Sequence, residues 1–464
     1  MPIWRHQEDA IAWAWERTAI LWHHGMGSGK TRTTLEFIAR KMKDRGISRI
    51  LVCCPKAVIA AWAKQCGLWI DGVRVILLEK GTSKQKDAQV MAALADTSPL
   101  IVVCNYETVW RLKSVEKVKW DVIVHDEIHR LKSASGVTSR WAGKLCKANP
   151  QAIRIGLSGT LIPHSILDAW AIYRAVESPE CATFGSSYTL HKATYAIYPP
   201  NQNFPVGWKN LPQAHAKIAA TTHHVKSADV LDLPPIQFID VAANLDPSEA
   251  KLYREIEREF CAVCERGTVT PANALVQLLR LQQICGGFVR FDETQKASQI
   301  AAKPAKAAAL SDMLEDLPST EPLVVFCRFS SDIAAVKAVC ADAGRTVSEL
   351  SGQVRELADW QAGKTNVLVT QIQAGGIGID LTRAAYCWFY SLGYSLAEYE
   401  QAVARLHRPG QEKKTIIYHL VATIDGRSTV DGRVYEALRE RKDILNVIVD
   451  GYQRGQYLAP VGAR

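Results

Sequence analysis

A glycine-rich turn between an apolar run and a helix-like run constrains the fold of this chain more than any other feature. The stretch LWHHGMGSGKTRTTLEF spans residues 21–37, with Gly25, Gly27 and Gly29 in the turn. Glycines let a backbone bend so that its N–H groups face phosphate oxygens. Lys30 supplies positive charge for phosphates, and the Thr31 hydroxyl is suited to ligate Mg²⁺. The stretch predicts a strand, a phosphate-binding loop and a helix, although His24 stands where the general pattern has glycine. A turn that binds nothing is the alternative.

Short apolar runs alternate with longer amphipathic stretches in two separate blocks. Such alternation favours βαβ units and parallel sheets. The first block has candidate strands at 19–22, 50–54, 75–78, 100–104, 122–125 and 153–157, and the second at 323–327, 366–370, 385–390 and 415–420. Residues 167–227 and 248–315 look largely helical, and LDLPPIQ, with two prolines, is a plausible linker. We therefore expect two α/β domains, 1–232 and 233–464, each with a helical insertion.

An acidic pair follows one of these candidate strands. In DVIVHDEIHRLK the apolar run ends at Asp126 and Glu127. Asp126 is placed to hold Mg²⁺, and Glu127 to act as the base that polarises an attacking water. An acidic helix start is the alternative, because Asp and Glu favour helix N-termini. A phosphate loop upstream makes the first interpretation the stronger one.

Composition adds limits on partner and compartment. The 464 residues carry a net charge of +9, which fits a polyanionic partner and equally fits a basic soluble surface. The twelve cysteines are scattered, as in a reduced intracellular protein, and the single C-x-x-C, Cys261 and Cys264, lacks a second pair for a zinc site. The N-terminal MPIWRHQEDA lacks the apolar core of a signal peptide. We expect a cytoplasmic protein without a membrane span.

Several motifs in fixed order resemble Swi/Snf-type ATPases of helicase superfamily two. DEIH resembles their DEAH-type box, and DEIHRLKSASGVTSR is similar to the same region. WRHQEDAI, LVCCPKAVIAAW, VVCNYETV and LSGTLIPHSILDAW match further motifs of the first lobe. LLRLQQIC, LVVFCRF, VLVTQIQAGGIGIDLTRA and YEQAVARLHRPGQEK resemble motifs of the second lobe. The resemblance runs from about residue 4 to 438 and implies two RecA-like lobes that use ATP and Mg²⁺.

The resemblance implies a role for each matching position. Nucleotide binding falls to Gln7, Gly25, Gly27, Ser28, Gly29, Lys30, Thr31, Gly378 and Asp380, with Thr31 and Asp126 on Mg²⁺. Catalysis falls to Lys30, Glu127, Arg405 and Arg408, the two arginines acting as arginine fingers from the second lobe. Coupling falls to His129, Ser158, Gly159, Thr160 and Gln401. Contacts to nucleic-acid backbone fall to Lys56, Tyr106, Arg328, Gln373, Gly375 and Gly376. Local packing is as good an explanation for Tyr106 and Arg328. Gln401, Arg405 and Arg408 are spaced to share one face of a helix.

Some positions depart from the family pattern. The family usually has acidic residues just before its phosphate loop, where this chain has His24 and Gly25, and GTLIPHS replaces its GTPIQN. It often has an arginine pair where this chain has His223 and His224. None of these changes removes an expected phosphate or metal ligand.

The leading hypothesis is an ATP-dependent translocase or helicase that moves along DNA, preferably duplex DNA. A motor on RNA and an ATP-gated nucleic-acid clamp without translocation are the alternatives. We find no added reader or nuclease motif, so we expect a compact monomeric motor, similar to those of phages and mobile elements.

Overall fold

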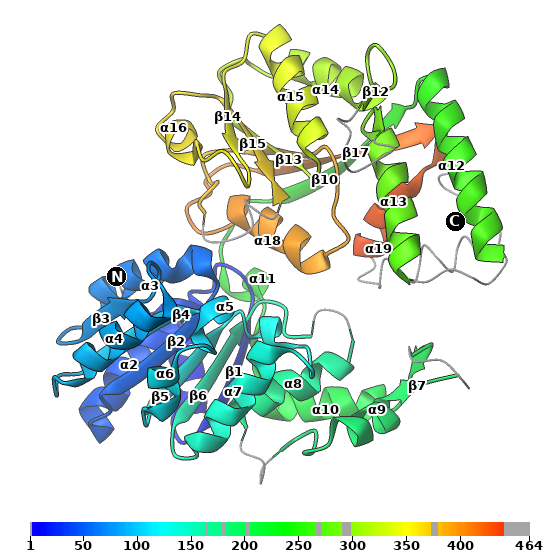
Figure 1. Ribbon diagram of the computed structural model, residues 1–464. Helices are drawn as coiled ribbons and strands as arrows, with labels where there is room; N and C mark the ends of the chain where they lie inside the picture. The colour runs from blue at the N-terminus through cyan, green and yellow to red at the C-terminus, as the bar shows by residue number, and fades with distance from the viewer. Residues whose placement is uncertain are drawn as a thin grey trace. The chain divides into compact units, whose positions relative to one another are not determined.

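The computed structural model describes residues 2–162, 165–177, 182–199, 205–265, 271–289, 298–372 and 379–439. The chain divides into two compact units, Met1–Asp232 and Leu233–Arg464. Each unit has its own sheet and its own helices (Figure 1).

Unit 1 is built on a parallel sheet with the order β3-β4-β2-β5-β6-β1-β9. Its strands are β1 (Ala19–His24), β2 (Arg49–Cys54), β3 (Arg74–Leu77), β4 (Leu100–Asn105), β5 (Val122–Asp126), β6 (Ile153–Ser158) and β9 (His223–Val225). Successive apolar residues of a strand enter different cores. Leu21 and Leu51 pack in one, and Trp22 and Val52 in the other. Both faces are therefore buried, as is typical of parallel sheets.

Helices cover both faces of this sheet (Figure 1). They are α1 (Arg5–Ala14), α2 (Lys30–Arg45), α3 (Ile59–Trp69), α4 (Ser83–Leu94), α5 (Tyr106–Val109), α6 (Lys113–Lys117), α7 (Val137–Ala148), α8 (Leu167–Val176), α9 (Tyr188–Tyr195), α10 (Leu211–Thr221) and α11 (Ser227–Val230), with short 3₁₀ turns η1 (Lys56–Val58) and η2 (Ile128–Leu131). A small antiparallel hairpin, β7 (Ala196–Ile197) and β8 (Gly207–Trp208), lies between α9 and α10.

Unit 2 is built on a second parallel sheet with the order β10-β17-β16-β13-β15-β14. Its strands are β10 (Ile236–Asn244), β13 (Leu323–Cys327), β14 (Val347–Leu350), β15 (Val367–Gln371), β16 (Tyr386–Phe389) and β17 (Thr415–Ile424), with β18 (Arg427–Ser428) antiparallel to β17. A separate two-stranded piece joins β11 (Phe288–Val289) to β12 (Ser298–Gln299).

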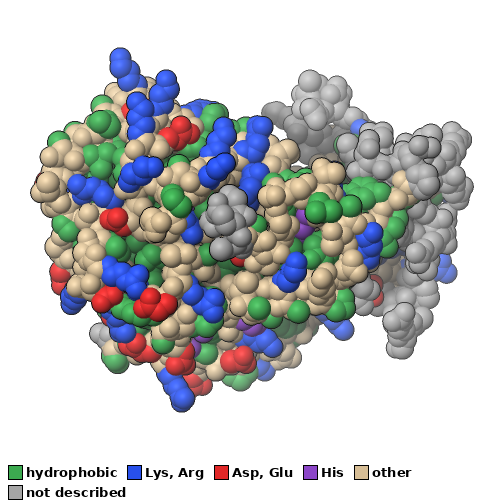
Figure 2. Space-filling model, turned by 90° about the horizontal axis from the view of Figure 1, so that it is seen from below, with side chains coloured by type: hydrophobic (Ala, Val, Ile, Leu, Met, Phe, Trp, Pro, Cys, Tyr) green, Lys and Arg blue, Asp and Glu red, His purple; other side chains and the backbone are tan. Residues whose placement is uncertain are grey.

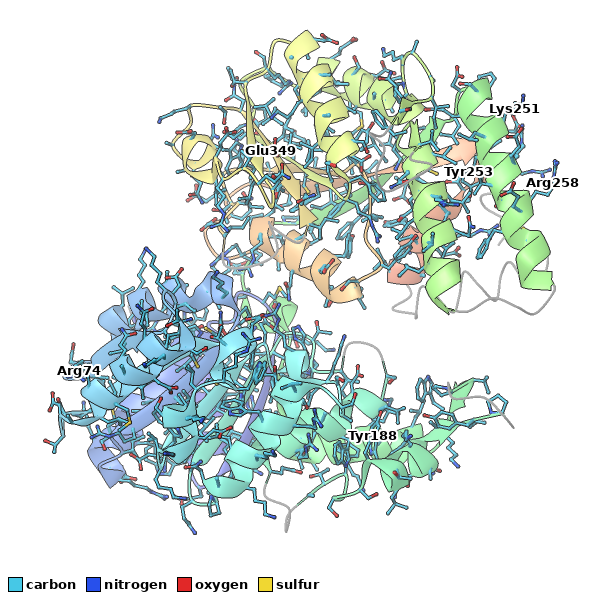
Figure 3. The ribbon with its side chains drawn as sticks, viewed as in Figure 1. Arg74, Tyr188, Lys251, Tyr253, Arg258 and Glu349 are labelled. Atoms are coloured by element: carbon cyan, nitrogen blue, oxygen red, sulfur yellow. The ribbon has the colours of Figure 1, made fainter. Side chains whose placement is uncertain are left out.

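The helices of unit 2 pack against this sheet and against one another. They are α12 (Pro247–Glu265), α13 (Pro271–Cys285), α14 (Ala305–Glu315), α15 (Ser330–Asp342), α16 (Leu357–Gln361), α18 (Leu396–Leu406) and α19 (Val430–Arg439). On α12 the fully buried Tyr253 accepts a 2.8 Å hydrogen bond from the backbone N–H of Val430, whereas Lys251 and Arg258 point outward (Figure 3). This division matches the apolar spacing of the helix.

The predicted α/β class with two parallel sheets is confirmed, and every expected strand run contains a strand. Three edge or near-edge strands, β9, β10 and β14, lie outside the runs we expected. Within the described ranges, no helix combines the length and apolarity that crossing a bilayer requires.

Candidate nucleotide site

Three neighbouring strands of unit 1 bring the predicted nucleotide residues to one edge of the sheet. The strands β5, β6 and β1 are adjacent and parallel, with Asp126 paired to Leu157 and Ser158 paired to His23. Carboxyl ends of parallel strands meet at one edge, which is where ligands bind in open α/β sheets. The phosphate loop, the acidic pair and the segment 158–160 therefore meet here.

The phosphate loop has the backbone that its glycines predict. Gly27 and Gly29 both have a φ of 79°, in the left-handed region that favours glycine. Helix α2 begins directly afterwards at Lys30, so its unpaired N–H groups open onto the loop. The Lys30 ammonium donates to the carbonyl oxygens of His24 at 2.9 Å and Gly25 at 3.3 Å. The cation is therefore held within the curve of the loop.

Two residues of α1 contact the backbone of the phosphate loop. The fully buried Gln7 amide donates to the carbonyls of Ser28 at 3.2 Å and Gly29 at 3.4 Å, and its oxygen accepts from Trp4 N–H. His6 Nε2 lies 2.8 Å from the backbone carbonyl oxygen of Ser28. A Cβ on Gly29 would lie 2.3 Å from Gln7 Nε2. Gln7, a predicted nucleotide-binding residue, makes these contacts to the backbone of the loop.

Asp126 is a half-buried carboxylate with defined partners. Its Oδ2 accepts a 2.8 Å hydrogen bond from Trp62 Nε1, and its Oδ1 accepts one from the Glu127 N–H at 3.0 Å. Burial raises the pKa of Asp126 to about 6, and the negative charge of Glu127 acts in the same direction. The Tyr106 hydroxyl donates to the Asp126 carbonyl at 2.7 Å. Two adjacent, half-buried acids favour a bound cation.

Glu127 stands next to the expected coupling residues. Its backbone is left-handed, with a φ of 51°, which strains any residue except glycine. His129 Nδ1 lies 3.3 Å from Glu127 Oε2 and 3.1 Å from Ser158 Oγ. Ser158 Oγ in turn donates to the Thr160 carbonyl at 2.8 Å. A polar chain therefore runs from Glu127 to Thr160. The Gly159 carbonyl, next to Ser158 in the sequence, lies 3.1 Å from His23 Nε2 of β1.

Unit 2 carries the predicted arginines at the end of α18. Gln401 and Arg405 lie in the helix, but Arg408 lies beyond it, because α18 ends at Leu406 with His407 as its cap. The shared helix face expected for all three residues is therefore wrong. Pro409 explains the early end, since the residue before proline avoids helical backbone. Arg408 Nη1 approaches the Ile379 carbonyl at 3.4 Å.

Asp380 also belongs to unit 2 and directly follows the glycine-rich motif in the sequence. Its Oδ1 accepts from the Thr382 N–H and hydroxyl at 2.9 and 2.7 Å. These bonds close a turn just after the loop. Gly378 itself lies outside the described residues, as do Gln373, Gly375 and Gly376.

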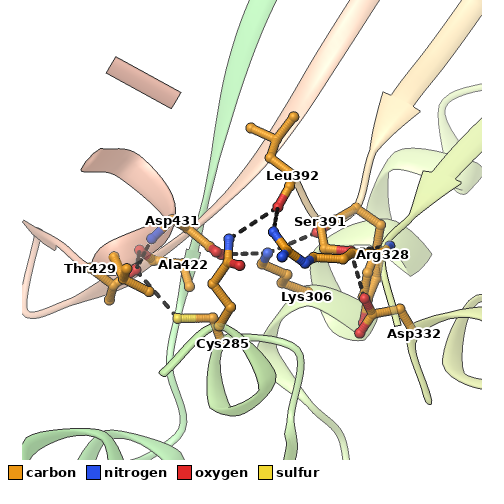
Figure 4. Close-up of polar contacts among 12 residues, drawn as sticks. Cys285, Lys306, Arg328, Asp332, Ser391, Leu392, Ala422, Thr429 and Asp431 are labelled. Carbon is orange, nitrogen blue, oxygen red and sulfur yellow. Dashed lines mark hydrogen bonds and ion pairs between the residues drawn. The ribbon is translucent and has the colours of Figure 1, made fainter. Parts of the chain in front are cut away.

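The described nucleic-acid candidates differ in exposure. Lys56 is exposed at the start of η1. Tyr106 is 4% exposed and its hydroxyl is engaged with Asp126. Arg328 donates to the Leu392 carbonyl at 3.3 Å and lies 4.3 Å from the Tyr394 ring centroid (Figure 4). The contacts of Tyr106 and Arg328 are those of the packing alternative.

Sequence reasoning assigned no site role to three residues that contact this edge. Trp62 lies in the motif LVCCPKAVIAAW, and its indole N–H donates to Asp126. Ser227 Oγ donates to the Met26 carbonyl at 2.6 Å, and His223 contacts His24. Ser227 and His223 carried no local signal.

Comparisons with known proteins agree with this architecture. The family model described as SNF2-related domain matches residues 6–287, and the helicase conserved C-terminal domain matches 305–410. The chain is 22% identical over 437 residues to the ISWI chromatin-remodeling complex ATPase ISW1 of Saccharomyces cerevisiae, covering 90% of this chain and 37% of that protein. It is 20% identical over 513 residues to the DNA repair and recombination protein RAD54B of Gallus gallus, covering 96% and 54%. The chain thus spans well under two thirds of these relatives.

Among solved structures, it is similar to the SWI2/SNF2 ATPase core of Sulfolobus solfataricus in complex with dsDNA, with a TM-score of 0.45 and 20% identity over 98% of this chain and 94% of that one. The family models, together with the motif order and the parallel sheets, decide the classification. This chain belongs to the SNF2-related family.

Proposed function

We propose that this chain hydrolyses ATP in the presence of nucleic acid and uses the energy to move along DNA. The observation that carries the proposal is the meeting of Lys30, the acidic pair and the His129–Ser158 contact at one edge of the unit 1 sheet. A purely structural role does not call for a strained acid beside a phosphate-type loop.

The loop fits a nucleoside triphosphate. Gly27 and Gly29 leave room for backbone N–H groups to approach phosphate oxygens, and the start of the 16-residue α2 favours negative charge. When phosphate binds, the Lys30 ammonium replaces its hydrogen bonds to the loop carbonyls with hydrogen bonds to phosphate oxygens, and it stays in the same position. The Gln7 amide stabilises this conformation of the loop by its hydrogen bond to the Ser28 carbonyl.

The acidic pair fits a divalent cation. Asp126 presents a half-buried carboxylate whose pKa is raised by burial and by Glu127, so a nearby cation relieves both effects. Thr31, the second residue of α2, offers a hydroxyl oxygen to the same cation from the end of the phosphate loop. When bound there, Mg²⁺ supplies charge neutralisation for the phosphates.

Glu127 is the proposed base. Its left-handed backbone directs the side chain toward His129, which bridges to Ser158. In our proposal Glu127 orients the attacking water and takes its proton, and the His129–Ser158–Thr160 chain carries the resulting change toward the rest of unit 1. In the same proposal, Arg405 and Arg408 of unit 2 act as arginine fingers, which stabilise the negative charge of the phosphates in the transition state.

DNA is the proposed track. Lys and Arg side chains are spread widely over the face drawn in Figure 2, and the chain carries a net charge of +9. Such a surface binds nucleic-acid backbone without reading sequence. Relatives named for chromatin remodeling and for DNA repair support DNA over RNA. We further propose a duplex track and translocation without wide strand separation.

The test is ATP hydrolysis by the full chain across duplex DNA, single-stranded DNA and RNA. We expect the strongest stimulation by duplex DNA, and loss of stimulated hydrolysis in Lys30→Ala, Glu127→Gln and Arg408→Ala. Two exposed residues supply matched controls, Lys43→Ala on α2 and Glu116→Gln on α6, which should retain activity. Rapid turnover by Glu127→Gln would contradict the assignment of the base.

Two further outcomes separate the alternatives. Stronger stimulation of ATP hydrolysis by RNA than by duplex or single-stranded DNA would identify RNA, and not DNA, as the track. A triplex-displacement assay tests movement, since a static clamp hydrolyses ATP or binds DNA without displacing the third strand. Displacement that depends on ATP is the expected result.

A further inference from the structure

The last strand of unit 1 lies against the phosphate loop. Strand β9 extends the sheet beside β1, with His223 opposite Trp22 and Val225 opposite His24. The Gly25 N–H donates to the Val225 carbonyl at 2.8 Å. The chain then enters α11 and leaves unit 1 at residue 232. The segment that ends unit 1 is therefore hydrogen-bonded to the loop.

Ser227 supplies a second attachment. Its hydroxyl donates to the Met26 carbonyl at 2.6 Å. A Cβ on Gly25 would lie 2.2 Å from the same hydroxyl oxygen, so this close approach requires glycine at position 25. Gly25 replaces an acidic residue of the family pattern, and the contact with Ser227 gives the reason.

A pair of histidines makes the third attachment. His24 Nε2 lies 2.9 Å from His223 Nδ1, with ring centroids 5.1 Å apart. His24 is fully buried and its ring stacks on Trp22 at 5.8 Å. Beside it, the rings of His23 and His224 lie 4.6 Å apart. The departures from the family pattern at positions 24 and 223 are thus in contact. One histidine pair stands where an acid and an arginine are expected.

The surroundings of the pair disfavour a proton. His24 faces Lys30, His6 and His23 as well as His223, and burial lowers its pKa to about 2. Burial also lowers the pKa of His223, which faces His6 and His224, whereas Asp9 opposes the effect. Two neutral rings share one N–H between the facing nitrogens. A proton on this pair brings a cation into a positively charged, buried place.

We propose that His24, His223 and Ser227 are positioning residues that hold the phosphate loop ready for nucleotide, and that acid weakens this hold, because each histidine takes up a proton more readily once the pair has separated. The proposal rests on the nucleotide binding proposed above. It makes the last segment of unit 1 a part of the nucleotide site. It also predicts that an ion pair at the same two positions keeps the attachment and removes its dependence on pH.

The experiment compares the full wild-type chain with Ser227→Ala, the double variant His24→Asp/His223→Arg, and the control His215→Asn, an exposed histidine of α10. Affinity for a fluorescent ATP analogue and the KM and kcat for ATP are measured from about pH 8 to about pH 5.5, where histidines titrate. For wild type and the control we expect KM and the analogue Kd to rise about fivefold in acid, the equivalent of one neutral hydrogen bond. We expect kcat to change little by comparison.

The variants give distinct results. Ser227→Ala should raise KM and Kd about fivefold across the whole range, for the same reason, while keeping the slope with pH. The double variant should give a flat profile. A double variant that keeps the wild-type slope, or Ser227→Ala with wild-type Kd, overturns the proposal. If the double variant does not fold, His24→Asn/His223→Asn carries the same expectation of a flat profile. A wild-type chain that binds no nucleotide at about pH 8 overturns the proposed function instead.

Discussion

Glu127 shows how a single residue is held in a conformation that folding does not favour. Its left-handed backbone, with a φ of 51° and a ψ of 52°, is one that glycine adopts freely. Its charge also lies beside Asp126, where it raises the pKa of that half-buried acid. Strain and repulsion at the same residue are expected where chemistry, rather than stability, selects the side chain.

Replacing Glu127 with glycine should therefore stabilise the protein and inactivate it. Relief of the backbone strain is worth about 1 kcal/mol. The free energy of unfolding, measured by urea titration, should rise by that amount, while stimulated ATP hydrolysis should disappear. Glu116→Gly, in the ordinary helical backbone of α6, is the control and should be destabilised. A less stable Glu127→Gly protein would show that the conformation is not strained.

His24 gives unit 1 a stability that depends on pH. Its pKa is lowered from 6.5 to about 2 by burial and neighbouring positive groups. As pH falls below the unfolded value, the unfolded chain binds the proton first, so stability present above about pH 6.5 is progressively lost. By about pH 5 the loss from this histidine is about 2 kcal/mol.

The variant His24→Asn removes this titration. Wild type should be the more stable protein near neutral pH, and its advantage over His24→Asn should shrink by about 2 kcal/mol between about pH 7 and about pH 5. Urea titrations at each pH measure the difference, with His215→Asn as an exposed control. A constant difference would mean that His24 does not titrate on unfolding.

Residues of the candidate site were predictable where their signal is local. Lys30 and Thr31 follow glycines, and Asp126 follows an apolar run, so a strand end and a turn are enough to place them. Ser227 and His223 were not predictable in this way, because they reach the loop through a parallel pairing of β1 with β9 across about 200 residues. Arg408 shows the opposite error, since helical spacing was extended past a proline.

At the scale of elements, the buried central strands were predictable, whereas β9, β10 and β14 at the edges of the sheets were not. Leu323–Cys327 is a continuous apolar run with neighbours on both sides. Strand β10, at the edge of the same sheet, reads IQFIDVAAN, with exposed and half-buried residues that resemble an extended linker. Strand β9 has three residues and two of them are histidines. Such strands form because a partner strand is already present, so only tertiary context identifies them.

A buried ion pair joins two elements of unit 2 that are far apart in the chain. Lys306 of α14 lies 2.5 Å from Asp431 of α19, with side chains 1% and 6% exposed (Figure 4). Lys306 also donates to the Tyr390 carbonyl at 2.8 Å. Removing one partner leaves the other charge buried and uncompensated, which is costly, whereas removing both is often neutral.

We therefore expect Lys306→Met to lower the free energy of unfolding by about 3 to 5 kcal/mol. Asp431→Leu should have a similar cost. The double variant Lys306→Met/Asp431→Leu should recover most of the loss. Urea titrations of the four proteins form a double-mutant cycle, and the exposed pair Lys364–Asp359 supplies a control of small effect. Additive losses in the double variant would show that the two charges do not depend on each other.

At the scale of the whole molecule, each unit has the parts of an independent domain. The buried apolar clusters of unit 1 use residues up to Ala214, and those of unit 2 begin at Leu245. Each sheet is complete within its unit. The segment between them contains Pro234 and Pro235, which favour an extended chain. We therefore expect each unit to fold by itself, whereas the proposed ATP hydrolysis draws on residues of both.

This separation predicts that residues 1–232 fold alone, bind nucleotide and fail to hydrolyse it efficiently. The fragment retains the phosphate loop, Asp126, Glu127 and the β9 attachment, but it lacks Arg405 and Arg408. Circular dichroism with thermal melting tests folding, the fluorescent ATP analogue tests binding, and turnover with duplex DNA tests catalysis. Wild-type Kd with little DNA-stimulated turnover is the expected result, because positive charge at the transition state is worth several orders of magnitude in phosphoryl transfer. Full turnover by the fragment would remove the arginines from the mechanism. A fragment that does not fold would place the boundary, or the source of stability, elsewhere in the chain.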